Sequence, residues 1–315
     1  MSPTQIRPLV SSACGLLMLS CVQGAQPTTP KQPPPRIIQV ETPYVFLRAS
    51  AWVELHAWIA AVARSPREEE DPEIDEAAKG YVTALASDTH DEVLGRTTSA
   101  IAACNDDDCA RAALAGTPFA EAFAATLPGF LAKQWAEHAT QARTGMEIAR
   151  AAMGADVGPL VQRISHDLAI AWPSTPPVVN LVTEAPLPGK EAPVRVVLAA
   201  RGGGCLSKHR GEPQRVHDAR IMDCLLVRAV LGLRERSEIA QDTSIDRGKW
   251  AALVVHAVAT AVTAWEPAHE SVLRGSAEEA MPEVMAWLAR EWPARLDGES
   301  AAAFAKRYAS APRAP

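Results

Sequence analysis

The sequence predicts an α+β fold that is predominantly α-helical, with a small β-hairpin or sheet at about residues 177–200. Apolar residues recur three and four positions apart through much of the chain, which is the spacing of helices that bury one face. Two short segments are instead rich in β-branched residues and are bounded by prolines and glycines, which is typical of strands. Apolar residues make up 48% of the 315-residue chain, enough to build a core.

The helical spacing comes first in four segments, residues 50–64, 72–87, 117–132 and 134–154. Ser50 stands where a side-chain oxygen can cap the first of them. Asp106 to Asp108 place negative charge where another helix is expected to begin, which the helix dipole favours.

The predicted strands, 177–184 and 193–200, come next and are expected to pair. Residues 219–233 follow and are apolar on nearly all sides, which predicts a buried helix. Three further helices are expected at 247–265, 278–292 and 300–308. We therefore divide the chain into a signal (1–20), a tether (21–36), a helical part (37–172) and a part with the small sheet and more helices (173–315), the last two forming one composite domain over 37–315.

The N-terminal segment has the layout of a secretory signal. Arg7 is the only charged residue before a short apolar run, residues 16–19, which ends at Ser20 and Cys21. The run is too short for a membrane span, which needs about 20 apolar residues. Export is therefore the predicted fate of the chain.

Residues 18–21 (Met-Leu-Ser-Cys) resemble the lipobox of bacterial lipoproteins. The resemblance implies that Cys21 carries a lipid such as palmitate, becomes the first residue of the mature chain and attaches it to a membrane. Val22 stands where an aspartate commonly retains such proteins at the inner membrane. An outer-membrane location, facing the periplasm or the surface, is therefore expected.

The motif departs from the family pattern, which has Leu where this chain has Met18 and a small residue where it has Leu19. Residues 22–24 (Val-Gln-Gly) also offer a site for ordinary signal cleavage, which would release a secreted or periplasmic soluble protein. Retention of the segment as a cytosolic helix is the third alternative.

Residues 26–36 contain five prolines, and such a stretch is extended at about 3.1 Å per residue, which suits a tether. The net charge of −6 becomes −7 when Arg7 is removed with the signal. An acidic domain without a basic patch argues against nucleic acid as a partner. The expected partners are the membrane, through the N-terminal lipid, and an unknown envelope protein or ligand.

Four cysteines remain after the signal, Cys104, Cys109, Cys205 and Cys224. An even number in an oxidising compartment usually forms disulfides. Four cysteines allow three connectivities, and we favour the two local pairs, Cys104 with Cys109 and Cys205 with Cys224. A zinc thiolate site is the alternative, but the Cys-x4-Cys spacing is looser than that of zinc ribbons.

Residues 250–265 resemble the active-site helix of gluzincin-type zinc peptidases, with His256 at the first ligand position. Ala257 stands where the family has the glutamate that activates water, and Thr260 where it has the second ligand histidine. The resemblance therefore implies a degenerate relative. An ordinary amphipathic helix that contains one histidine explains the same residues.

Glu266, His269 and Glu270 follow this helix and could join His256 in a metal or acid/base site. Capping of the next helix explains the same acids. Glu54 and His56, on an early helix, form a further candidate pair.

Three functions fit these observations. The first is a cell-envelope lipoprotein whose domain is a non-catalytic binding or scaffold unit, so that the chain is not an enzyme and needs no cofactor. The second is a hydrolase or metallopeptidase-like protein built around His256, in which zinc would be the cofactor. The third is a structural spacer.

Overall fold

The computed structural model describes residues 33–64, 72–86, 90–154, 157–183, 198–199, 205–206 and 208–313. The predicted signal, Cys21 and the tether as far as residue 32 lie outside this range, as does most of the predicted strand 193–200. Residues 34–315 group into one compact unit. It is mostly helical with a small mixed sheet, as the sequence predicts.

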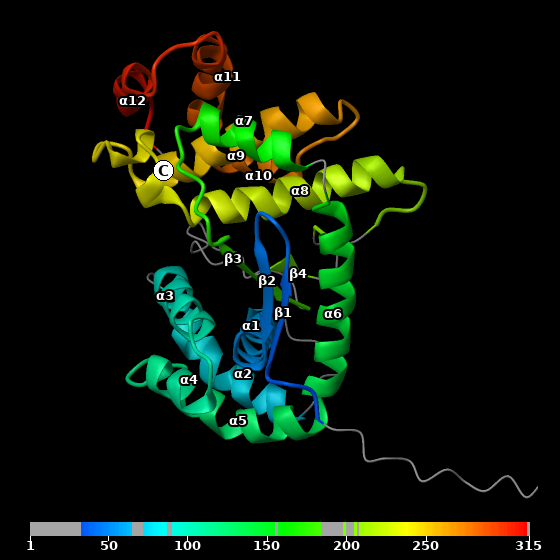
Figure 1. The fold of residues 1–315 in the computed structure, drawn as a ribbon. Coiled ribbons are helices and arrows are strands. Elements are labelled where there is room, and N and C mark those ends of the chain that lie inside the picture. The colour runs from blue at the N-terminus through cyan, green and yellow to red at the C-terminus, as the bar shows by residue number, and fades with distance from the viewer. Residues whose placement is uncertain are drawn as a thin grey trace, which may run out of the picture. The chain divides into compact units, whose positions relative to one another are not determined.

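The sheet is built from two segments far apart in the chain (Figure 1). β1 (Ile37–Glu41) pairs antiparallel with β2 (Phe46–Ser50), and β3 (Val178–Val182) lies parallel to β2. The two-residue β4 (Leu198–Ala199) continues the sheet in parallel with the end of β3. The predicted strands are therefore parallel neighbours in a sheet, not the two arms of a hairpin.

Seven helices follow the first two strands in the described part of the chain. They are α1 (Ala51–Arg64), α2 (Pro72–Leu85), α3 (His90–Ala102), α4 (Asp107–Leu114), α5 (Ala120–Lys133), α6 (Trp135–Ala152) and α7 (Val157–Asp167). α1 begins directly after β2, where Ser50 Oγ accepts a hydrogen bond from the Val53 amide at 3.4 Å, and Asp106 Oδ1 caps α4 at 2.8 Å. Most of α1 is buried because α2, α3, α5, α6 and the sheet all contact it.

Among the described residues after β4 there are five more helices: α8 (Gln214–Leu231), α9 (Arg247–Trp265), α10 (Val272–Ala280), α11 (Pro282–Leu296) and α12 (Ala301–Ala309). Two short 3₁₀ turns, η1 (Arg234–Arg236) and η2 (Ile239–Gln241), join α8 to α9. α8 contacts α9 on one side and α6 and β3 on the other, so it links the C-terminal helices to the sheet (Figure 1). The prediction of a buried helix at 219–233 is confirmed.

Helix α12 is held against α9 by Lys249. Its buried ammonium donates to the carbonyls of Ala309 and Ala311 at 3.0 and 2.9 Å, and Tyr308 Oη donates back to the Lys249 carbonyl at 2.6 Å. The last carbonyls of a helix have no partner within it, and a cation that binds them satisfies them. Lys249 therefore acts as a cap for α12.

The structure corrects the predicted elements in two places. The single helix expected at 278–292 is two helices, because Pro282 begins α11 and the residue before a proline avoids helical geometry. β1, β2, α3 and α7 were not predicted from the sequence. None of the described helices is long and apolar enough to cross a membrane.

Candidate functional site

His256, the residue on which the hydrolase prediction depends, is buried in α9. Its ring lies edge-on to Trp292, with 5.9 Å between ring centroids, and its Nδ1 has no hydrogen-bond partner among the described residues. Burial, and then the positive charge of Arg274, lower the pKa of His256 to about 4. The imidazole is therefore neutral near pH 7. The Thr260 hydroxyl donates a hydrogen bond to the His256 carbonyl at 2.7 Å, one turn earlier in the same helix.

The three candidate residues after α9 do not converge with His256. Glu266 forms an ion pair with Arg215 at 2.8 Å, and Glu270 is exposed. His269 is buried, with its Nε2 3.3 Å from Asp223 Oδ2 on α8. Within the described ranges no group of three or more histidine, cysteine, aspartate or glutamate side chains could hold a metal ion. The residues present therefore do not form the zinc site that the hydrolase prediction needs.

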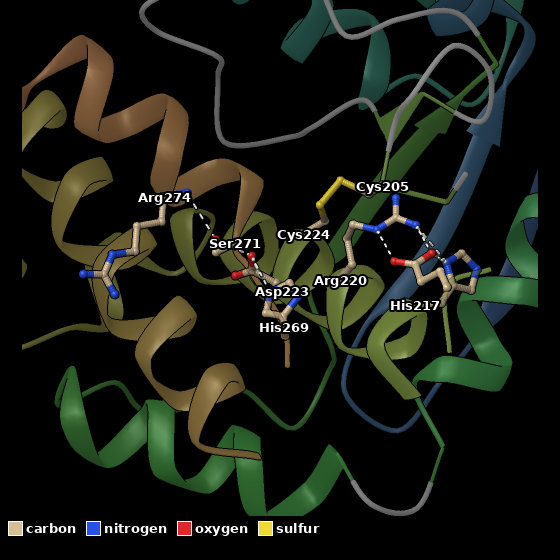
Figure 2. The surroundings of a disulfide bond; sticks show 9 residues. Cys205, His217, Arg220, Asp223, Cys224, His269, Ser271 and Arg274 are labelled. Atoms are coloured by element: carbon tan, nitrogen blue, oxygen red, sulfur yellow. Dashed lines mark hydrogen bonds and ion pairs between the residues drawn. A yellow bond between two sulfur atoms is a disulfide. The ribbon is translucent and has the colours of Figure 1, made fainter. Parts of the chain in front are cut away.

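The cluster around Asp223 was not predicted from the sequence (Figure 2). Ser271 Oγ donates to Asp223 Oδ2 at 2.5 Å, and His269 approaches that same oxygen. Figure 2 shows both side chains turned toward the carboxylate. In a catalytic triad the serine hydroxyl donates a hydrogen bond to the histidine that removes its proton. Here the Ser271 hydroxyl donates to the aspartate instead. Ser271 also caps α10 by accepting from the Arg274 amide at 3.1 Å, so the cluster fixes the start of α10.

A second network lies on the same helix, α8. Arg220 donates to both carboxylate oxygens of Glu212, at 3.3 and 2.8 Å, and contacts His217 Nδ1 at 3.0 Å. Burial alone would raise the pKa of Glu212, but the hydrogen bond and charge of Arg220 lower it below its usual value. Burial and the Arg220 charge also lower the pKa of His217. The network is an ion pair at the start of α8 that leaves His217 neutral.

The candidate pair on α1 separates into two further clusters. Glu54 is buried, and its Oε1 lies 2.7 Å from His138 Nδ1 of α6. Thr183, at the end of β3, donates its hydroxyl to Glu54 Oε1 and its amide to Oε2 at 2.9 Å. The buried carboxylate thus has donors from α6 and β3, so it ties three elements together.

His56 faces a different set of partners. Its Nδ1 lies 2.7 Å from Tyr81 Oη and its Nε2 lies 3.3 Å from Thr97 Oγ1. Thr97 donates its own hydroxyl hydrogen to a backbone carbonyl, so His56 Nε2 is the donor in their contact. Burial lowers the pKa of His56 to about 3. Both ring nitrogens are satisfied with the ring neutral, which is a structural role.

Two disulfides join the four cysteines in the pairs that the sequence favoured. Cys104 binds Cys109 across the turn between α3 and α4, and Cys205 binds Cys224 of α8 (Figure 2). The zinc thiolate alternative is therefore wrong. Disulfides are typical of proteins that fold outside the cytoplasm, in an oxidising compartment.

The signal that would have found the unpredicted polar clusters is present in the sequence. Asp223 and Arg228 stand inside a segment that is apolar on nearly all sides, so a helix there must bury them. The pairing of Glu54 with His138 and Thr183 has no such signal, because the partners are 84 and 129 residues away.

The chain matches no protein-family model, no curated protein and no solved structure.

Proposed function

We propose that this protein is an exported lipoprotein of the cell envelope, held to a membrane by a lipid on Cys21. The observation that carries the proposal is the apolar run that ends at Cys21, followed by the proline-rich segment 26–36. The two disulfides of the folded unit support export, because they need an oxidising compartment to form.

We propose further that residues 34–315 form a non-catalytic binding or scaffold domain. Most of the described buried acids and histidines bind other side chains of the fold and tie its elements together, while His256 Nδ1 is enclosed without a partner. A catalytic residue must instead face a substrate with its reactive atom available. The polar clusters therefore support a structural role better than the hydrolase built around His256.

The lipid anchor is tested by metabolic labelling with an alkyne analogue of palmitate in bacteria that produce the full chain. We expect Cys21→Ser to abolish the label and to block maturation, because the serine hydroxyl is not a thiol and does not form the thioether to the lipid. Cys14→Ser is the matched control, since Cys14 lies in the same signal segment, and it should keep the label. Equal labelling of the Cys21→Ser chain and the unchanged chain, or no label on either, would contradict the anchor.

A further inference from the structure

Arg228, in the last turn of α8, carries a positive charge that nothing in the described chain neutralises. Its Nε is enclosed without a hydrogen-bond acceptor, and no charged group of the described residues shifts its pKa. Other arginines of the described interior have acceptors. Arg220, two turns earlier on α8, binds Glu212, whereas Arg295 binds the carbonyls of Glu299 and His166, although its Nε is enclosed as well. Arg228 is therefore an arginine in a desolvated position that lacks an acid.

The surroundings of Arg228 on its own helix are apolar. The residues three and four positions away share its helical face. Three of these, Cys224, Leu225 and Leu231, are buried. Burial lowers the pKa of Arg228 to about 10, so the guanidinium is still charged at neutral pH. A cation in such a place is costly unless a counter-charge accompanies it.

The helix dipole does not replace that counter-charge. A cation in the last turn of a helix gains about 0.3–1 kcal/mol from the dipole at an exposed site. The gain accounts for the position of Arg228 along α8, but it supplies no counter-ion. An external acceptor on the two terminal nitrogens, which are not enclosed, would balance the charge.

The guanidinium selects the chemistry of that acceptor. Its parallel N–H groups match the two oxygens of a carboxylate or a phosphate. One positive charge in apolar surroundings balances one negative charge, whereas a phosphate dianion would leave an excess negative charge desolvated. The side chain as a whole is only partly buried, and of its three nitrogens only Nε is fully enclosed without a partner. A ligand can therefore reach the guanidinium.

We propose that Arg228 binds the carboxylate of a monoanionic ligand whose remaining part is apolar. The inference goes beyond the proposed function, because it assigns a ligand site to the folded unit, and it does not depend on lipidation at Cys21.

Calorimetric titration of the exported protein with hexanoate tests the site. We expect saturable binding with one site per chain, and Arg228→Gln should weaken it by at least about tenfold, because it removes a charge-assisted pair of hydrogen bonds. Arg236→Gln is the matched control, since Arg236 is exposed on the 3₁₀ turn that follows α8, and it should bind hexanoate as the unchanged protein does. Hexanol, which has the apolar stem without the carboxylate, should not compete.

Two results would overturn the proposal: no hexanoate binding to the unchanged protein, or equal binding by Arg228→Gln. Binding of inorganic phosphate more tightly than hexanoate would overturn the class of ligand. If Arg228→Gln does not fold, Arg228→Lys replaces it, because lysine keeps the positive charge but lacks the paired N–H groups of the guanidinium. Undiminished hexanoate affinity in that variant would equally contradict the assignment.

Discussion

At the scale of single residues, five histidines are buried within the part of the chain whose side chains are described, each in different surroundings. They are His56, His138, His217, His256 and His269. A buried histidine that stays neutral makes the folded state less stable in acid, because the histidine binds a proton in the unfolded chain but not in the folded one. The described interior therefore makes the stability of this protein depend on pH.

The direction of that dependence follows from the lowered pKa values. His56 and His256 have folded pKa values of about 3 and about 4, below the ordinary value of 6.5, and the pKa of His217 is lowered as well. Between about pH 6.5 and pH 4 the unfolded state binds more protons than the folded state, so the free energy of unfolding falls as the pH falls. Each such histidine contributes a slope of up to about 1.4 kcal/mol per pH unit.

Urea unfolding of the exported protein between pH 7.5 and pH 5 measures this slope. We expect His256→Gln to reduce the slope of the free energy of unfolding against pH by the contribution of one histidine, since glutamine does not titrate. His209→Gln is the control because His209 is exposed. A slope that stays the same in His256→Gln would show that the buried ring does not resist protonation.

Local patterns predicted individual residues well only where the partner is near in sequence. The capping positions of Ser50 and Asp106 follow from their own segments. The donors of Glu54 come from α6 and β3, and only the folded chain brings them to α1. Sequence spacing therefore leaves such a cluster unseen.

At the scale of elements, most helices were predicted from the sequence, whereas the first two strands were missed. The periodicity of a helix is local, so α1, α6, α8 and α9 were each expected near their observed bounds. β1 and β2 pair with each other within residues 37–50, where Ile37, Ile38 and Val40 are β-branched, so a local strand signal was present and was missed. Only the pairing of β2 with β3, across more than 100 residues, has no local signal. The break before α11 was also missed, although the proline that causes it is visible in the sequence.

The two disulfides make a prediction at this scale. Cys205 and Cys224 are 19 residues apart and Cys104 and Cys109 are 5 apart. The loop-entropy relation gives about 3 kcal/mol for the longer loop and about 2 kcal/mol for the shorter one. We therefore expect replacing Cys205 and Cys224 by alanine to lower the free energy of unfolding more than replacing Cys104 and Cys109. Denaturant unfolding of the two double variants measures the order, and the reverse order would mean that the native contacts around the bonds outweigh the loop entropy.

At the scale of the whole molecule, the folded unit has two disulfides, which need an oxidising compartment to form, and this agrees with the export that we propose. The unit spans residues 34–315, and α8 connects its C-terminal helices to the sheet. The fold class was predicted because the helical spacing recurs in many separate segments, whereas only two segments have the β-branched pattern of strands. The ligand site that we propose at Arg228 has no local sequence motif, because it depends on the absence of an acidic partner in the folded chain.

The intact mass of the protein purified from the envelope of producing cells tests the central claim most directly. The account predicts a chain that starts at Cys21, carries the added mass of a lipid and has no free thiol among Cys104, Cys109, Cys205 and Cys224. A chain that starts after residue 24 without lipid would contradict the anchor, and the mass of the full precursor with free thiols would contradict export itself.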